Sequence, residues 1–389
     1  MKNMDRTYTE TVCALALNSI FGFEPKIPLS MIRNLGSAEA VFELSQDELN
    51  SILGPFSRYK GRICAEAFDS AARELEMLTA DGCLFIHTGM DCYPNLLKEC
   101  EDAPVGLYVR SGTPPEKLFD GTPLVAIVGT RDISPYGKFW CERAVQSLAY
   151  APVRPVVVSG LALGVDITAH RAALECGLST IGVSPVGITD IYPWRHRGDA
   201  EKMASTEGCG IITDYPPGTA PVAINFLRRN RIIAGMTQAT ILVESKIKGG
   251  GMMTARLSSG YGRDVFCLPG RVDDLRSQGC NRLIADKIAD CIADPDSLPE
   301  ALGLGRWRRH RGRTLAEELE RHYNGREDAG ALIRVATAIK DNRGLCIDEL
   351  CGLLDMSYSI VSRLTGELES DGFIVTDLMQ RCSIDSKIS

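Results

Sequence analysis

The chain has 389 residues, of which 44% are hydrophobic and 24% are charged, and its formal net charge is −7. This composition is typical of a globular protein of two or three domains and excludes a polycation, so any nucleic-acid site must be a local basic patch. The chain has no run of about 18 apolar residues, no signal-peptide pattern and no C-x-x-C pair among its 14 cysteines, which predicts a cytoplasmic protein with reduced cysteines, no membrane span and no metal site.

Residues 1–82 are predicted to form a helical domain. Short segments of this region carry apolar residues at helical spacing, with Ser or Asp near their starts, and a longer helix over residues 62–82 closes it. We interpret the region as a packing domain. A small helical DNA-binding module, of the SAM or helix-hairpin-helix kind, is the alternative.

Residues 83–300 are predicted to form an α/β domain with a Rossmann-like, doubly wound parallel sheet. Six apolar, β-branched runs recur here, at residues 124–128, 156–159, 180–185, 211–214, 241–244 and 265–268. Helical segments separate them, and continuous apolar strands that alternate with helices indicate a parallel sheet covered on both faces. The edge strand near residues 265–268 is a candidate dimer surface.

The remaining chain is predicted to be a linker and a small C-terminal domain. Residues 301–328 read as an exposed basic linker with arginines at 306, 308, 309, 311 and 313, either a secondary DNA contact or a solvated hinge. Residues 329–389 read as three helices and a strand pair, which suits a winged-helix-like domain. Its candidate recognition helix, residues 357–369, has Arg363 as its sole basic residue, which disfavours a regulator that reads duplex DNA.

Two of the loops that leave the predicted strands combine glycine with polar residues. Ligands of an open parallel sheet bind beyond the carboxyl ends of its strands. The first loop is predicted to hold a phosphate at the start of the helix near Ser134; its other candidate residues are Gly129, Thr130 and Arg131. The second loop contains Ser159 and Gly160. Asp166 and His170 follow on one helix face, where we favour a structural hydrogen bond over a catalytic acid–base dyad.

The other two candidate segments are strongly basic or rich in glycine. One is Arg228, Arg229, Asn230 and Arg231, which opens a helix. The other is a loop with Lys246, Lys248, Gly249, Gly250 and Gly251, whose backbone N–H groups suit a phosphate. Several such loops at one sheet edge suit a nucleic-acid backbone. Neither a nucleophile with a base nor a carboxylate cluster for a metal accompanies them, so the pattern favours binding over catalysis.

Five strings in the central region resemble the DprA (Smf) family of bacterial DNA-processing proteins. They are VAIVGTRDISPYG, SGLALGVDITAHRAAL, RRNRIIAG, GGGMMTA and PGRVDDLRSQGCNRLI. The resemblance implies a Rossmann-like homodimer without cofactor or enzymatic activity, which binds single-stranded DNA and hands it to the recombinase RecA in natural transformation. It also implies that Gly129, Thr130 and Arg131 contact phosphates. The implied pocket lining is Ser159, Gly160, Arg229, Asn230, Arg231 and the glycines at 249–251.

Two departures from the family and one alternative function belong to this prediction. Leu163 stands where many members have a basic residue, and Gly249–Gly251 replaces a Ser-Gly-Ser segment, so Lys246 or Lys248 is expected to compensate. The candidates for base stacking are Tyr136, Tyr192, Trp194 and Phe226. The alternative is a nucleotide-binding protein or an N-glycosidic hydrolase of the Lonely Guy group, but its P-G-G-x-G-T-x-x-E motif does not occur here.

Overall fold

The computed structural model describes residues 6–54, 56–305, 315–342, 344–377 and 380–384. The chain divides near residue 307 into two compact units. Within the described residues, no helix has the length and apolarity needed to cross a membrane.

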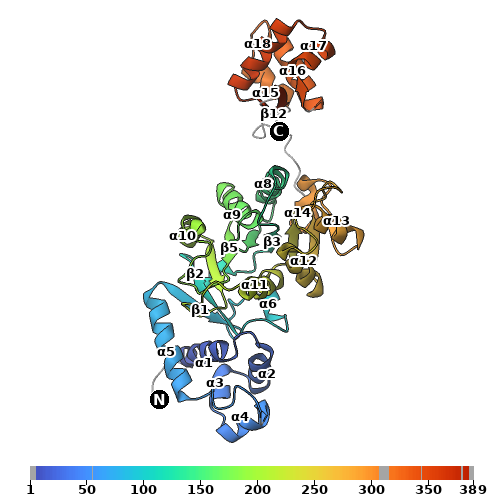
Figure 1. Ribbon diagram of the computed structural model, residues 1–389. Helices are drawn as coiled ribbons and strands as arrows, with labels where there is room; N and C mark the ends of the chain where they lie inside the picture. The colour runs from blue at the N-terminus through green and yellow to red at the C-terminus, as the bar shows by residue number, and fades with distance from the viewer. Residues whose placement is uncertain (1–5, 55, 306–314, 343, 378–379, 385–389) are drawn as a thin grey trace. The chain divides into compact units, whose positions relative to one another are not determined.

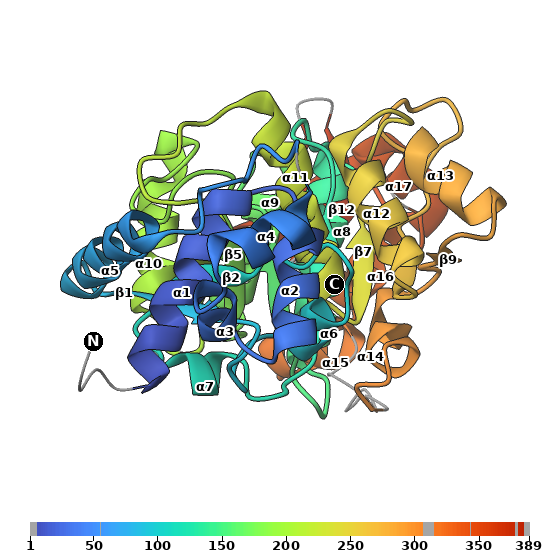
Figure 2. The same cartoon turned by 90° about the horizontal axis from the view of Figure 1, so that it is seen from below.

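The larger unit begins with five helices, as the sequence predicts. They are α1 (Arg6–Phe21), α2 (Lys26–Leu35), α3 (Ala38–Phe42), α4 (Gln46–Leu53) and α5 (Ala65–Ala80). Local capping sets some of their starts; Ser45, for example, forms a reciprocal capping box with Glu48 at the start of α4. Figure 2 shows α5 beside α1. Apolar residues of these helices share one core with strand residues such as Phe85 and Tyr108, so the helices are packed onto the sheet.

A nine-stranded sheet forms the centre of the unit. Its strands are β1 (Cys83–His87), β2 (Gly106–Arg110), β3 (Leu124–Val128), β4 (Val156–Ser159), β5 (Thr180–Val183), β6 (Gly210–Thr213), β7 (Ala239–Leu242), β8 (Asp264–Cys267) and β9 (Asp290–Cys291). Their order is β1-β2-β6-β5-β4-β3-β7-β8-β9. β1 and β2 pair antiparallel with their neighbours and all other pairs are parallel.

Helices cover both faces of the sheet, because successive strand residues point to opposite sides. Val125 and Ile127 of β3 belong to the core under α8 and α9, whereas Ala126 and Val128 belong to the core under α11 and α12. These helices are α8 (Pro135–Ala149), α9 (Val165–Glu175), α11 (Ala223–Met236) and α12 (Gly250–Gly260). Figure 1 shows α8 and α9 apart from α11 and α12. The predicted doubly wound α/β fold is confirmed.

Shorter helices complete the larger unit. They are α6 (Asn95–Lys98), α7 (Pro115–Leu118), α10 (Arg197–Ser205), α13 (Gln278–Ala285) and α14 (Leu298–Ala301), with 3-10 turns at Trp194–His196 and Pro295–Ser297.

Two expectations about the sheet need correction. The six predicted strands are present, but β1 and β2 add an antiparallel ribbon at one end. At the other end β9 pairs with β8, so residues 265–268 are not the edge strand. β9 has two residues, both exposed, and therefore lacks the buried apolar run that identifies a strand in a sequence.

The order of the strands places a topological switch point at the centre of the sheet. From β3 the chain adds β4, β5 and β6 on one side, and then β7, β8 and β9 on the other. The crossovers leaving β3 and β7 therefore diverge to opposite sides, and a crevice opens at the carboxyl ends of these two strands.

The smaller unit contains four helices and a three-stranded antiparallel sheet among its described residues. They are α15 (Leu315–His322), α16 (Ala329–Asp341), β10 (Leu345–Cys346), α17 (Ile347–Leu354), α18 (Tyr358–Ser370), β11 (Ile374–Thr376) and β12 (Arg381–Ile384), with strand order β10-β12-β11. The winged-helix assignment stays a prediction.

The expected linker at residues 301–328 is too long. Leu315, Leu319 and Tyr323 are buried in the core of the smaller unit, so α15 belongs to that unit. The five arginines at 306–313 lie outside the described residues.

Candidate functional site

A cavity of about 790 Å³ lies at the switch point. It is formed by the loop after β3, the start of α11 and the glycine-rich loop after β7. The predicted loop and helix residues that line it are Gly129, Thr130, Arg131, Arg229, Asn230, Lys246, Lys248, Gly249, Gly250 and Gly251. Three segments that are far apart in the sequence thus contribute to one concave site, as their positions after parallel strands predict.

The loop after β3 is held in place by its backbone. Thr130 N–H donates to the carbonyl of Glu244 at 2.7 Å, and the carbonyl of Thr130 accepts from Val165 N–H at 3.1 Å. A Cβ at Gly129 would lie 2.5 Å from Val165 Cγ2, so this position requires glycine. The fixed backbone positions the exposed side chain of Arg131, whose guanidinium carbon lies 4.9 Å from the centre of the Phe226 ring.

The start of α8 does not offer the phosphate site that the sequence suggested. The buried carboxylate of Glu244 accepts from Ser134 N–H at 2.9 Å and from Ser134 Oγ at 2.5 Å. Ser134 Oγ in turn accepts from Gly137 N–H and caps the helix. A protein carboxylate thus takes the place expected for an anion at this positive helix end. Ser134 does not line the cavity.

The start of α12 does face the cavity. Gly249 is its N-cap residue, no side chain caps it, and Gly250 and Gly251 form its first turn. The first N–H groups of a helix lack intrahelical partners, so an uncapped start attracts anions. A Cβ at Gly251 would lie 3.1 Å from Gly129 Cα, whereas a Cβ at Gly250 would meet no atom within 4 Å. The glycines therefore allow both close packing and close approach of a ligand.

Two lysines add positive charge beside this helix start. Lys246 and Lys248 are exposed and line the cavity. In the part of the chain that the structure describes, neither lysine nor Arg131 forms a salt bridge. Cations without a carboxylate partner remain available for a phosphate backbone.

Arg229 is a buried cation at the floor of the cavity. Its Nη1 donates to the carbonyls of Gly160 and Val183, and Nε donates to Asn230 Oδ1 at 3.2 Å. Burial lowers the pKa of Arg229 to about 10, while Asp166 raises it, so the side chain stays protonated at neutral pH. A Cβ at Gly160 would lie 2.2 Å from Arg229 Nη1. Gly160 thus makes room for this guanidinium.

Four other predicted residues lie outside the cavity and have structural contacts. Ser159 Oγ donates to the carbonyl of Ile127 at 2.6 Å and joins two strands. Gly160 leaves the space that the guanidinium of Arg229 occupies. Arg231 is paired with the carboxylate of Asp214, and Arg228 lies on the ring of Phe23 at 3.8 Å. In the run from Arg228 to Arg231, neighbouring side chains of α11 point in different directions. For this reason Arg229 and Asn230 line the cavity, whereas Arg228 and Arg231 do not.

Asp166 and His170 do not form an acid–base dyad. His170 is fully buried, its Nδ1 lies 2.7 Å from Thr180 Oγ1, and burial lowers its pKa to about 3. Asp166 lines the cavity and its Oδ2 accepts from Ala162 N–H at 3.4 Å. Burial raises the pKa of Asp166 and Arg229 opposes that rise. The structural interpretation of this pair is therefore the one the geometry supports.

Two of the four candidate aromatic residues lie at the cavity. Tyr192 and Phe226 line it, with ring centres 5.3 Å apart in an edge-to-face arrangement. Tyr136 instead donates from its hydroxyl to the carbonyl of Pro269, and Trp194 stacks on Arg197. Tyr192 comes from a long loop after β5, so its position depends on tertiary structure that the sequence does not reveal.

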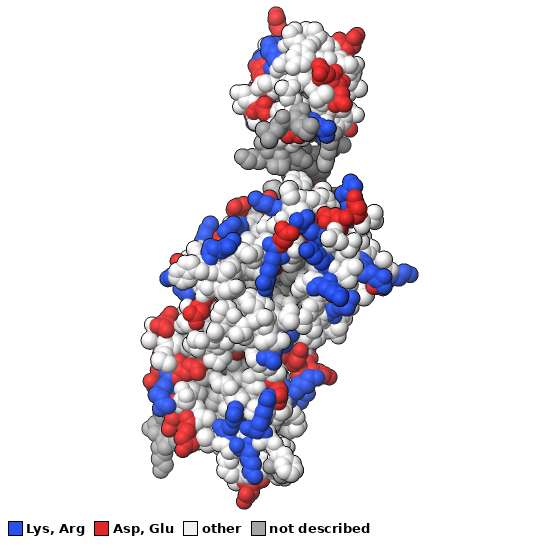
Figure 3. Space-filling view, viewed as in Figure 1, with Lys and Arg blue, Asp and Glu red and all other residues white. Residues whose placement is uncertain are grey.

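Positive side chains also lie on the surface of the larger unit outside the cavity, as Figure 3 shows. Lysine and arginine predominate over the part that carries α8, α9, α12 and α13, although the chain as a whole is acidic. The basic region is therefore local, as a nucleic-acid site in an acidic protein requires.

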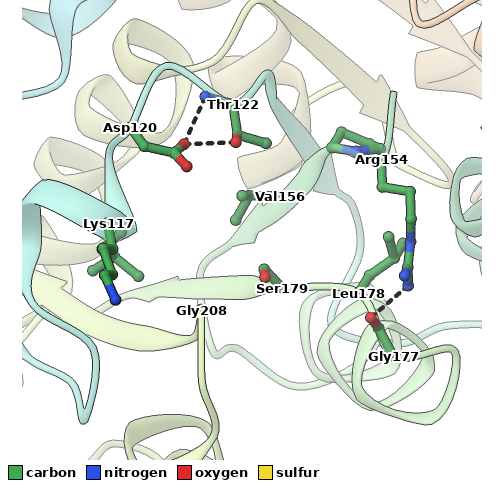
Figure 4. Close-up of a pocket in the computed structure, with 11 residues that line it drawn as sticks. Lys117, Asp120, Thr122, Arg154, Val156, Gly177, Leu178, Ser179 and Gly208 are labelled. Atoms are coloured by element: carbon green, nitrogen blue, oxygen red, sulfur yellow. Dashed lines mark hydrogen bonds between the residues drawn. The ribbon is translucent and has the colours of Figure 1, made fainter. Parts of the chain in front are cut away.

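A second cavity, of about 200 Å³, lies at the opposite end of the parallel strands, where their amino ends meet (Figure 4). It is formed by residues that precede β3, β4, β5 and β6, including Thr122 and Ser179. Arg154 lines it, but its guanidinium donates to the carbonyl of Gly177 at 2.5 Å. Asp120 accepts from Thr122 within the same cavity. Lys117 and Arg154 are the basic residues among those that line it, and the described residues form no glycine-rich loop here like the one after β7.

Comparison with known proteins identifies the relatives of the chain. Residues 84–303 match the family model described as DNA recombination-mediator protein A. The chain is 36% identical over 210 residues to the DNA processing protein DprA of Streptococcus pneumoniae, a match that covers 54% of this chain and 71% of that protein. It is 34% identical over 213 residues to protein Smf of Escherichia coli, of which it spans about half, 55% of each chain.

Solved structures agree with this match. The structure of the pneumococcal DprA aligns with a TM-score of 0.60 at 30% identity, covering 77% of this chain and 99% of the other. DNA processing protein A of Helicobacter pylori, whose structure was described for a unique single-stranded DNA binding mode, aligns with a TM-score of 0.50 at 31% identity. That alignment covers 56% of this chain and 95% of the other.

Proposed function

The chain belongs to the DNA recombination-mediator protein A family, and from this premise we propose that it binds single-stranded DNA in the cavity at the switch point. The observation that carries the proposal is the convergence of Arg131, Lys246, Lys248 and the uncapped start of α12 on one cavity. In this proposal they contact successive phosphates, and the bases stack on Tyr192 and Phe226.

The aromatic side chains at the cavity favour a single strand over a duplex. Tyr192 is 41% exposed, and Arg131 lies over Phe226 at the cavity wall. A base must leave its duplex stack to use such a surface, and each stacked base contributes roughly 1–3 kcal/mol. Backbone contacts and stacking both tolerate any sequence, so we expect weak sequence preference.

Fluorescence anisotropy with a labelled oligo-dT strand and the matching duplex, at two salt concentrations, tests this function. We expect tighter binding of the single strand and a loss of affinity as salt rises, because phosphate contacts release counterions. Equal affinity for both forms, or binding that does not respond to salt, would contradict the proposal.

Replacing Lys246 and Lys248 together with alanine should weaken single-strand binding about three- to tenfold. Each lost phosphate contact also lowers the slope of log affinity against log salt by about 0.7 for single strands, so the double variant should lose about 1.4. The matched control is the Lys117→Ala, Lys202→Ala variant, which removes two exposed lysines outside the cavity. An unchanged slope in the Lys246, Lys248 variant would show that these lysines do not reach phosphates.

Replacing Ser134 with alanine should affect stability and not DNA binding. The change removes the cap of α8 and the hydroxyl contact to Glu244, which should lower the free energy of unfolding by about 1 kcal/mol. Urea unfolding followed by circular dichroism measures this effect. A large fall in affinity at unchanged stability would instead restore Ser134 as a DNA ligand.

We further propose the handover and assembly that the family resemblance implies. Two copies would pair, and the bound strand would pass to RecA, with the smaller unit as a winged-helix domain. The recombination-mediator description of the family supports the handover. Sedimentation analysis tests the pairing. The effect of the protein on RecA filament formation on single strands coated with binding protein tests the handover, and an unchanged nucleation rate would contradict it.

A further inference from the structure

A third cavity, of about 450 Å³, lies between the helical N-terminal region and the start of α11. Phe23, just after α1, and Tyr215, just after β6, provide aromatic surface, and Arg228 of α11 completes the wall. Both regions belong to the larger unit, whose helices and sheet share one core. The cavity therefore has a fixed shape.

The first turns of α11 separate this cavity from the one at the switch point. Ala223, Phe226 and Leu227 line the switch-point cavity, which puts them on one face of the helix. The third cavity is lined by residues of the other face, including Ile224 and Arg228. A helix with its side chains is about 10–12 Å across, so a nucleic-acid strand that leaves one cavity needs to cross only this width to enter the other.

The surface between the two cavities is apolar. Val222, Ile224 and Leu227 are exposed by 48%, 46% and 40% respectively. Three exposed aliphatic side chains in six residues form a ridge that a single strand would cover with its bases or sugars.

Inside the third cavity, Phe23 and Arg228 form a flat stacking surface. The guanidinium carbon of Arg228 lies 3.8 Å from the centre of the Phe23 ring, and the ring is itself 5.2 Å from that of Tyr215. Phe23 is 38% exposed. Unstacked bases lie on aromatic rings and on arginine guanidinium planes, and this cavity offers both.

Asp214 also lines the cavity, and its negative charge is balanced by an arginine. Asp214 is buried and pairs with Arg231 through Oδ2, but its Oδ1 has no hydrogen-bond partner among the described residues. Oδ1 is itself enclosed by the protein, so it offers no contact to a ligand in the cavity. Because Arg231 balances the charge of Asp214, the unbalanced charge of Arg228 makes the cavity positive overall, which suits a nucleotide.

We propose that this cavity is a second base-binding subsite on the path of the single strand. It rests on the proposed function, since the same strand would occupy the switch-point cavity, cross the ridge and place one base against Phe23 and Arg228. The N-terminal helical region thereby takes part in DNA binding through its contribution of Phe23.

Affinity measured against strand length tests the subsite. Oligonucleotides of about 5 and about 15 nucleotides are compared, the shorter to fill one cavity and the longer to reach both. Phe23→Ala should weaken binding of the longer strand about five- to tenfold, which is the loss of one stacked base, and leave the shorter strand unaffected. Phe23→Tyr should retain binding of both. Phe56→Ala is the control, since Phe56 is 99% exposed in the same helical region and lies outside both cavities.

Photocrosslinking of the unsubstituted protein provides a second readout that does not depend on how the variants fold. A longer strand that carries 5-iodouracil should crosslink to the peptides of Phe23 or Tyr215. Crosslinks confined to Tyr192 and Phe226, or an equal effect of Phe23→Ala on both lengths, would overturn the subsite while leaving the proposed function intact. Failure of the unsubstituted protein to bind either length would overturn the proposed function itself.

Discussion

Replacing Arg131 with alanine should weaken binding of single-stranded DNA about 10- to 100-fold, with little change in stability. Arg131 is exposed, has no salt bridge among the described residues and lies over Phe226 at the cavity wall. A hydrogen bond to a charged group contributes about 1.5–3 kcal/mol, and the stacked guanidinium would also support the base on Phe226. Anisotropy with oligo-dT and urea unfolding measure the two effects.

Two further variants separate the causes of this effect. Arg131→Lys keeps the charge but loses the planar donor fork, so it should recover only part of the lost affinity. Arg154→Ala removes an arginine from the cavity at the amino ends of the parallel strands and should leave DNA affinity unchanged (Figure 4). Comparable losses in Arg131→Ala and Arg154→Ala would mean that overall charge, and not the switch-point cavity, governs binding.

The parallel part of the fold was predictable because its strands are buried on both faces. Such strands read as continuous apolar runs, and β3 and β4 agree with the predicted bounds at both ends. β1 and β2 are also largely buried, but they are short and precede the regular alternation of strands and helices that identified the other strands, and the exposed Leu84 interrupts the buried run of β1. The helix α15 was missed because its small apolar face follows directly on an arginine-rich segment.

The location of the site was predictable, but the role of each polar residue was not. The loops after β3 and β7 had to meet, since strand order alone brings parallel carboxyl ends together. The sequence gives no sign that Glu244, at the end of β7, turns back to occupy the start of α8. Likewise, the run from Arg228 to Arg231 looks uniformly basic, yet burial and helix geometry assign its arginines to different partners.

Arg231 illustrates this division most clearly, because its replacement should affect folding and not DNA contact. Arg231→Leu would leave the buried carboxylate of Asp214 without its cation and remove the contact to the carbonyl of Asp102. Breaking a buried ion pair on one side costs about 3–5 kcal/mol, so the free energy of unfolding should fall by about that amount. Urea unfolding measures it, and affinity per folded molecule for a short strand should stay unchanged.

The double variant Arg231→Leu, Asp214→Leu and the pH dependence identify the cause. Removing both charges should restore most of the stability, since an apolar pair avoids the uncompensated charge. Burial already raises the pKa of Asp214 and Arg231 opposes that rise, so the pKa should rise further in the single variant. The folded state then binds a proton that the unfolded state has released, and stability relative to the unsubstituted protein should increase as pH falls toward the unfolded pKa of about 3.9. If the Arg231→Leu variant is as stable as the unsubstituted protein at neutral pH, the ion pair does not stabilise the fold. The same conclusion follows if its loss of free energy of unfolding does not change with pH.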